Sequence, residues 1–201
     1  MKLFFSKGAC SLAARIMINE IGVDSAYESV NLRNKTTASG ADFLAINPKG
    51  GVPTLALQNG DILTENAIIL QYLCDQSKAT QLLPPVGDMN RYRALEWLNF
   101  VSTELHKGMG IMFNPAITQA LKNDVFIPIV QKKLSYVNHH LEHHQYLMGD
   151  QLTIADPYLF VMLLWTPHFN IDLKDWPHLN RYFNTLKQRE SIQCALKQEG
   201  L

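Results

Sequence analysis

Cys10 stands in a place where a thiol can be reactive. It follows Gly8-Ala9 and comes just before residues 11–21, an apolar segment with helical spacing. The first turn of a helix has unpaired N–H groups and the positive end of the helix dipole, and both stabilise a thiolate. In such a place the pKa of a free thiol, normally about 8.5, falls substantially. Taken alone, the pattern fits a reactive thiol and a buried cysteine at a turn about equally well.

The segment Thr64-Glu65-Asn66 suits a ligand that carries both a carboxylate and an ammonium group. We predict that it opens a helix capped by Thr64, and the free N–H groups of such a helix suit a carboxylate. The carboxylate of Glu65 suits an ammonium group. A γ-glutamyl end carries both groups and therefore fits this segment. Capping by Thr64 is expected whether or not a ligand binds.

Asn99, Thr103 and His106 follow spacings of four and three residues, which place them on one face of a predicted helix. This face lies beside an apolar stripe. A single histidine in such a position is more often structural. Aligned with Asn99 and Thr103, His106 becomes a candidate hydrogen-bond partner for a ligand.

Four histidines near the end of another predicted helix have spacings that could chelate a metal ion. No carboxylate or cysteine motif completes a coordination shell, and histidines near a helix C-terminus also complement the helix dipole. We therefore expect no native metal site, although adventitious nickel or zinc binding would fit. The residues are His139, His140, His143 and His144.

Short elements must position these residues, and their order predicts a thioredoxin-like domain, βαβαββα. Gly22 ends the first helix, and Asn59-Gly60 predicts a hairpin. In thioredoxin-like proteins the proline at the place of Pro53 is usually cis, which turns the backbone of Val52 outward to pair with a peptide. The predicted strands are 3–5, 27–32, 53–57 and 62–63, and the helices are 11–21, a short piece around Phe43 and one ending near Gln76.

The sequence Leu82-Leu83-Pro84-Pro85-Val86-Gly87 interrupts this pattern, and all that follows has helical spacing. We predict a thioredoxin-like domain over 1–80, a linker over 81–87 and an all-α domain over 88–201. Residues 159–165 are apolar on every side, as in a central helix. Thr153 and Asp156 form a predicted capping box with a folding role.

Composition favours a protein that acts on small molecules. Lysine and arginine together number 18, as do aspartate and glutamate. The chain therefore has no excess of positive charge for binding nucleic acid or an anionic membrane. Three scattered cysteines are too few for a disulfide framework, and we expect reduced thiols, with Cys74 and Cys194 as small buried hydrophobic residues. No segment approaches the length of a membrane span or an exported signal sequence. A cytoplasmic protein is expected.

Motifs along the whole chain resemble the bacterial beta-class glutathione S-transferases. In the first domain they are Met1-Lys2-Leu3-Phe4, Gly8-Ala9-Cys10-Ser11-Leu12-Ala13, Asn47-Pro48-Lys49-Gly50 and Leu63-Thr64-Glu65; in the second they are Glu96-Trp97-Leu98-Asn99, Thr103-Glu104-Leu105-His106-Lys107-Gly108 and Thr153-Ile154-Ala155-Asp156. The resemblance implies a cytosolic homodimer that conjugates glutathione to small electrophiles in detoxification. Glutathione would be a cosubstrate, with no other cofactor.

The resemblance also implies which residues contact glutathione. Cys10 and His106 would act at the sulfur, with Ser11 and Lys107 as possible auxiliaries, and Lys35 would meet the glycine carboxylate. The implied binding residues are Cys10, Lys35, Val52, Glu65, Asn66, Asn99, Thr103, Glu104, Leu105 and His106.

Phe5, Lys7 and Asn66 depart from the family, which often has Tyr, Pro and Ser or Gly there. Phe5 removes a candidate hydroxyl for thiolate activation. The side chain of Asn66 is larger than that of Ser or Gly, and we expect it to change how the γ-glutamyl carboxylate binds. Two alternatives to a transferase stay open. One is a thiol-disulfide reductase that uses Cys10 through a mixed disulfide with glutathione. The other is a binding protein that keeps the fold without turnover.

Overall fold

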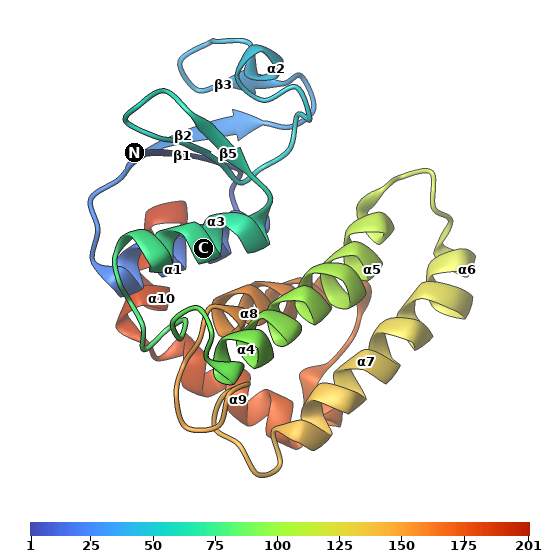
Figure 1. Ribbon diagram of the computed structural model, residues 1–201. Coiled ribbons are helices and arrows are strands. Elements are labelled where there is room, and N and C mark those ends of the chain that lie inside the picture. Colours follow the sequence, from blue (N-terminus) through green and yellow to red (C-terminus); the bar gives the residue numbers. More distant parts are fainter. The chain divides into compact units, whose positions relative to one another are not determined.

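A five-stranded sheet lies at the centre of the first part of the computed structural model, which describes residues 1–201 (Figure 1). The strand order is β3-β2-β1-β4-β5, with β1 parallel to β2 and every other neighbouring pair antiparallel. The predicted hairpin is confirmed, and the Leu57 N–H closes its turn by donating to the Asp61 carbonyl. The strands are β1 (Lys2–Phe5), β2 (Ala26–Asn31), β3 (Thr36–Thr37), β4 (Thr54–Ala56) and β5 (Ile62–Thr64).

Two helices, α1 (Leu12–Ile21) and α3 (Asn66–Gln76), lie on one face of this sheet, and the short α2 (Phe43–Ile46) lies on the other (Figure 1). Gly22 ends α1 in the left-handed conformation, with a φ of 76°, as predicted. These elements confirm the thioredoxin-like fold. The two-residue β3 is an addition that the sequence pattern was too short to indicate.

The start of α3 differs from the prediction, because Thr64 does not cap it. Thr64 is the last residue of β5 and pairs with Thr54. The N-cap residue is Glu65, which has a φ of 70° and whose side chain makes no capping hydrogen bond. The chain thus turns from strand to helix within one residue, in a conformation that L-residues rarely adopt.

The last helix, α10 (Glu190–Glu199), packs against α1 (Figure 1). Residues Met1–Thr80 and Arg189–Leu201 therefore form one compact unit, and Gln81–Gln188 form a second. The sequence pattern instead predicts α10 as part of the all-α domain over 88–201. An amphipathic pattern shows that a helix has an apolar face but does not show which partner covers it. Cys194 on this helix is exposed, so the expectation that it is buried was wrong.

The second unit is built around α8 (Ala155–Trp165), in which every residue except Leu164 is buried. The prediction of a central helix is confirmed. It packs against α4, α9 and the turn that precedes α5. The other α-helices are α4 (Met89–Phe100), α5 (Lys107–Gly110), α6 (Gln119–Leu121), α7 (Ile127–His140) and α9 (Pro177–Lys187). No helix is long and apolar enough to span a membrane.

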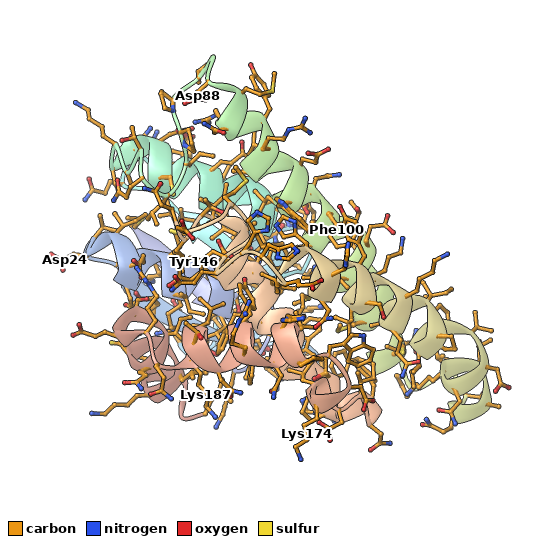
Figure 2. The ribbon with its side chains drawn as sticks, turned by 90° about the horizontal axis from the view of Figure 1, so that it is seen from below. Asp24, Asp88, Phe100, Tyr146, Lys174 and Lys187 are labelled. Carbon is orange, nitrogen blue, oxygen red and sulfur yellow. The ribbon has the colours of Figure 1, made fainter.

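Wider and narrower turns interrupt these helices. Residues Val101–His106 form a π-helical segment that continues α4 into α5, and Lys122–Phe126 form another that continues α6 into α7. Short 3₁₀ segments are Ile111–Phe113, Thr166–Phe169 and Leu173–Asp175. Asp88 and Phe100 mark the two ends of α4 in Figure 2. The apolar spacing of the sequence did not reveal these changes of pitch.

Asp156 at the start of α8 is buried and accepts four hydrogen bonds. The donors are the Leu147 N–H, the Thr153 N–H and hydroxyl, and the Tyr182 hydroxyl. Asp156 thus bonds back to Thr153 as the predicted capping box requires, while the threonine hydroxyl donates to the carboxylate instead of capping a helical N–H. Burial raises the pKa of Asp156, although these hydrogen bonds oppose the shift.

Residues 81–87 are part of the second unit. The Leu82 carbonyl accepts from the Ile154 N–H at 3.1 Å, and the Pro84 carbonyl accepts from Arg91 Nη1 at 3.0 Å. Leu82 and Leu83 are buried. The segment predicted as a linker is therefore held by side-chain burial and backbone hydrogen bonds to the helical unit.

Candidate thiol site

Cys10 lies in the loop between β1 and α1, two residues before the helix begins. Its side chain is nearly buried, with 7% of the residue exposed, and its Sγ donates to the Val52 carbonyl at 3.2 Å. The Ala13 N–H donates to the Cys10 carbonyl at 3.1 Å, so the residue is part of the first turn. The structure thus places the thiol at a helix N-terminus, where a thiolate is stabilised.

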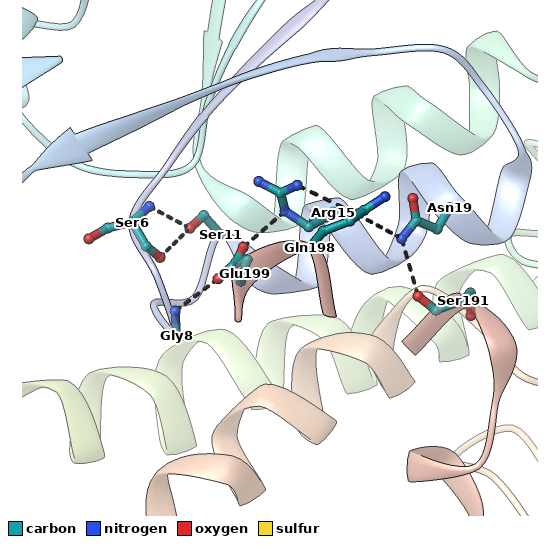
Figure 3. A network of polar contacts seen from close by, with 8 residues as sticks. All are labelled: Ser6, Gly8, Ser11, Arg15, Asn19, Ser191, Gln198 and Glu199. Carbon is teal, nitrogen blue, oxygen red and sulfur yellow. Dashed lines mark hydrogen bonds and ion pairs between the residues drawn. The ribbon is translucent and has the colours of Figure 1, made fainter. Parts of the chain in front are cut away.

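The loop before Cys10 is fixed by two side chains (Figure 3). Ser11 Oγ accepts from the Ser6 N–H at 3.2 Å and is fully buried, so this hydroxyl closes the loop. Glu199 Oε2 in α10 accepts from the Gly8 N–H at 2.8 Å. The C-terminal helix therefore holds the backbone two residues before the thiol.

Glu199 is paired with Arg15 of α1 in the interior of the first unit. Arg15 Nε donates to Glu199 Oε1 at 3.0 Å, and both side chains are almost fully buried. The guanidinium lies 4.1 Å from the Phe5 ring centre and 3.9 Å from that of Tyr27, so both rings make cation–π contacts with Arg15. Burial raises the pKa of Glu199, although the Gly8 N–H and Arg15 oppose the shift. Sequence reasoning missed this pair; the signal was a single arginine within the apolar residues of α1.

The Val52–Pro53 peptide bond is cis, as predicted. Neither the hydrogen bonds of the turns nor those of the side chains include the Val52 N–H, which leaves it open to a ligand. Asn47 Nδ2 holds the loop by donating to the Gly51 carbonyl and to Thr54 Oγ1, both at 2.9 Å. Lys35 Nζ donates to the Gly50 carbonyl at 2.7 Å. A cation therefore lies beside the loop that carries Val52.

The turn into α3 carries a carboxylate, a cation and a buried amide. Lys49 Nζ lies 2.8 Å from Glu65 Oε1 and 3.0 Å from Thr64 Oγ1. Asn66 Nδ2 donates to the Cys10 carbonyl at 3.0 Å, while its Oδ1 is buried without a hydrogen-bond partner. Lys49 stands in one of the family motifs, but its contact with Glu65 was not anticipated. Cys10, Val52, Glu65 and Asn66 thus belong to one connected group in the first unit.

His106 in the second unit is half-buried against α8. Its Nδ1 lies 2.6 Å from the hydroxyl oxygen of Tyr158, and its ring lies 5.3 Å from that of Trp165, between centres. It ends the π-helical segment. Such wider turns occur frequently at functional sites.

The other residues of the second unit that are predicted to contact glutathione differ in their exposure to solvent. Asn99 and Thr103 are exposed, and the Thr103 hydroxyl donates to the Asn99 carbonyl at 3.1 Å. Glu104 forms an ion pair with Lys133 of α7 at 2.5 Å. Leu105 is fully buried in the core, so only its backbone could meet a ligand, and Lys107 is exposed. The π-helical pitch separates His106 from the solvent-exposed side that Asn99 and Thr103 share.

The four clustered histidines do not share one helix, because α7 ends at His140. His140 and His144 stack with ring centres 4.4 Å apart. Each directs one ring nitrogen to a backbone carbonyl: His140 Nε2 lies 3.0 Å from the Leu147 oxygen, and His144 Nδ1 lies 2.8 Å from the His140 oxygen. Burial lowers the pKa of His140. No group of three or more potential ligands in the chain is arranged to hold a metal ion.

Comparison with known proteins shows the family. The model of the glutathione S-transferase N-terminal domain matches residues 8–76, and that of the C-terminal domain matches residues 100–190. Glutathione S-transferase GstA of Escherichia coli O157:H7 is 42% identical, with both chains covered completely. A sphingomonad glutathione S-transferase, solved in complex with glutathione, is 40% identical with a TM-score of 0.95 and complete coverage of both chains. The bacterial beta-class enzyme of Sphingomonas chungbukensis is 39% identical with a TM-score of 0.96, again with complete coverage. The chain therefore belongs to the glutathione S-transferases and is a bacterial beta-class enzyme of that family.

Proposed function

We propose that the enzyme binds glutathione through the group around Cys10 and transfers its thiolate to small hydrophobic electrophiles. The observation that carries this proposal is the contact of Cys10 Sγ with the Val52 carbonyl, beside a Val52 N–H that is open to a ligand. A backbone with a free N–H binds an extended peptide, and glutathione is a tripeptide. No cofactor besides glutathione is needed.

Charges in the first unit fit the two ends of glutathione. Glu65 suits the ammonium of the γ-glutamyl end, and the N–H groups at the start of α3 suit its carboxylate. Lys35 lies beside the loop of Val52 and suits the glycine carboxylate. Asn66 supports this arrangement by tying the start of α3 to the Cys10 carbonyl.

The second unit supplies His106 to the sulfur and an aromatic surface to the electrophile, with contacts from Asn99, Thr103, Glu104, the Leu105 backbone and Lys107. Phe113 is 47% exposed and meets Trp165 edge to face, with ring centres 5.1 Å apart. Trp165 in turn contacts His106. Met109 is fully buried, so it belongs to the core and not to the electrophile surface. An apolar electrophile fits the exposed ring of Phe113.

The experiment compares Cys10→Ala and His106→Ala with the wild type in glutathione calorimetry, conjugation and deglutathionylation assays. We expect glutathione to bind the wild type, and each variant to lose about tenfold in kcat/KM for conjugation, because His106→Ala removes a hydrogen bond to the thiolate and Cys10→Ala removes the thiol beside the Val52 backbone. Cys194→Ser, which changes an exposed thiol, is the control and should match the wild type.

Two outcomes would contradict the proposal. Absence of glutathione binding at millimolar concentration would exclude both a transferase and a reductase. Full conjugation by Cys10→Ala with loss of deglutathionylation would assign Cys10 to a mixed disulfide and hence to reductase chemistry. A role in detoxification and a cytoplasmic location belong to the same proposal, and the three free thiols are in keeping with a reducing compartment.

We further propose that the protein is a homodimer that uses a groove between α4 and α7. The groove has a volume of about 860 Å³ and an aromatic floor, in which Trp97 contacts Phe100, Tyr136 and His140. Tyr136 and Ile129 at its side are 57% and 49% exposed. Large exposed apolar patches are uncommon on monomers and mark contact surfaces.

Light scattering tests the dimer. Tyr136→Lys should shift the mass toward that of the monomer, because it places a charge in the apolar groove. Val86→Lys, at a position 82% exposed outside the groove, should leave the mass unchanged. A monomeric wild type would contradict the proposal.

A further inference from the structure

The phenol of Tyr158 is placed to control the protonation of His106. Tyr158 lies in α8, is 1% exposed, and puts its hydroxyl oxygen 2.6 Å from His106 Nδ1. The two rings meet edge to face, with centres 5.5 Å apart and planes at 61°. The distance is that of a strong hydrogen bond. The two residues are far apart in the sequence but belong to the same unit.

The chemistry of the two groups decides the direction of this hydrogen bond. A neutral imidazole has one nitrogen with a lone pair and one with a proton. An imidazole nitrogen is a far better proton acceptor than a phenol oxygen, because imidazole is protonated near neutral pH while a phenol instead loses its proton at a pKa of about 10. The favoured arrangement has the Tyr158 O–H donating to His106 Nδ1. The remaining proton of a neutral His106 then lies on Nε2.

We propose that Tyr158 is a positioning residue that holds His106 in the tautomer with its proton on Nε2, so that His106 donates a hydrogen bond to the glutathione sulfur. This inference rests on the proposed function, which places His106 at that sulfur. The buried hydroxyl sets the tautomer, and the Trp165 ring, 5.3 Å away between centres, limits rotation of the imidazole.

The tautomer determines what His106 can do. With its proton on Nε2, His106 stabilises a thiolate as a hydrogen-bond donor, and the same nitrogen cannot accept the thiol proton as a general base. The thiol proton must leave to solvent or to another group, and His106 then stabilises the anion that remains. Hydrogen bonds from a fixed donor to an anion are worth most where water is excluded.

Nuclear magnetic resonance of protein labelled with ¹⁵N-histidine tests the tautomer without any turnover. The chain has seven histidines, and comparison with His106→Ala assigns the signal of His106. At about pH 8.5, where an ordinary histidine is neutral, we expect the wild type to show an unprotonated Nδ1 and a protonated Nε2. Tyr158→Phe should change this pattern toward a mixture of the two tautomers. Tyr182→Phe, which removes another fully buried hydroxyl of this unit, should leave it unchanged.

Conjugation kinetics supply the second measurement. Tyr158→Phe should lower kcat/KM by about three- to tenfold in the wild type, the range of one hydrogen bond, and should have no further effect in a His106→Ala background. A thermal melt of each variant separates loss of folded protein from loss of rate.

The outcomes distinguish the two hypotheses. A protonated Nδ1 in the wild type, or a His106 signal unaffected by Tyr158→Phe, would overturn the inference. So would an equal loss of activity from Tyr158→Phe with and without His106. If the tautomer is as expected but His106→Ala conjugates at the wild-type rate, the positioning by Tyr158 stands and the proposed role of His106 fails.

Discussion

Three distant segments hold the loop of Cys10, and each bonds to a different atom of it. Val52 accepts from the sulfur, Asn66 donates to the Cys10 carbonyl, and Glu199 accepts from the Gly8 N–H. The position of the thiol is therefore set mainly by contacts to its backbone. Substitutions of these partners should alter ligand binding without changing any group that reacts.

Asn66→Ala tests whether contacts to the backbone of the Cys10 loop position the thiol. The substitution removes the donor to the Cys10 carbonyl, so we expect the dissociation constant for glutathione to rise about threefold or more and the protein to lose about 1 kcal/mol of stability. Calorimetry and chemical denaturation measure the two effects. Asn19→Ala, which removes a similar bond to the Ser191 carbonyl far along α1, is the control for stability. Equal glutathione affinity in both variants would contradict the expectation.

Some site residues could be predicted and others could not. Cys10 is marked by a glycine-containing loop before a helix. Pro53 is marked by its X-Pro bond at the place where thioredoxin-like proteins usually have a cis proline. The positive φ of Glu65 carries no such signal, because its residue type does not favour that conformation. The amide of Asn66 reaches Cys10 across 56 residues of sequence, and only the folded chain brings these two together.

At the scale of elements, Glu28 links the edge of the sheet to its centre. From β2 it accepts hydrogen bonds from Ser39 at 2.5 Å, just beyond β3, and from Lys2 in β1 at 2.9 Å. The Ser39 hydrogen bond, then those of Lys2 and Thr37, lower the pKa of Glu28 from 4.5 to about 2. A carboxylate with a lowered pKa stabilises the fold above its unfolded pKa and loses that effect as the pH falls.

Glu28→Gln should therefore be less stable than the wild type at pH 7, by about 1 kcal/mol. The difference should be complete above pH 4.5, shrink as the pH falls below that value, and be nearly lost by about pH 2. Thermal melts across this range give the measurement, and Asp24→Asn, at an exposed position, is the control. A difference that stays constant with pH would show that the charge of Glu28 is not its cause.

The docking of α10 on α1 depends on the buried pair of Arg15 and Glu199. Removing one partner leaves the other charge buried alone, which typically costs about 3 kcal/mol or more. We expect Glu199→Met and Arg15→Met to be strongly destabilised, and the double variant Arg15→Met/Glu199→Met to be less destabilised than the sum of the two single losses. Chemical denaturation of the four proteins measures the coupling. Additive losses would show that the pair is not coupled.

The helices show what apolar spacing can and cannot predict. The apolar residues Leu98, Leu105 and Met109 are buried as expected. The π-helical turn between them is invisible in that spacing, because the same residues face the core at either pitch. It nevertheless sets the side of the helix on which His106 lies.

At the scale of the whole molecule, the first unit is made of two segments, Met1–Thr80 and Arg189–Leu201. A fragment of residues 1–80 lacks Glu199 and leaves Arg15 without its partner. We expect this fragment to lack a cooperative thermal transition. Residues 1–80 joined to 189–201 by a long Gly/Ser linker should show one by circular dichroism. The same fusion with Glu199→Gln is the control and should melt at a lower temperature. Equal behaviour of the short and the joined fragment would contradict a structural role of α10.

The sequence predicted the boundary near residue 80 because prolines and a glycine mark it. It could not predict that the chain returns to the first unit, since α10 has the same amphipathic character as helices of the second unit. The partner of α10 is identified only in the folded chain, where the buried Glu199 carboxylate meets Arg15 and the Gly8 N–H.

The return of α10 also fixes the order in which the protein can be completed as it is synthesised. The strands and the loop of Cys10 leave the ribosome before the helical unit, but the helix that holds Gly8 and pairs with Arg15 is translated after that unit. The helical unit between them can fold as soon as it emerges. The thiol loop therefore gains its final support only after the whole helical unit has been synthesised, so a nascent chain that stops before α10 has no finished thiol loop.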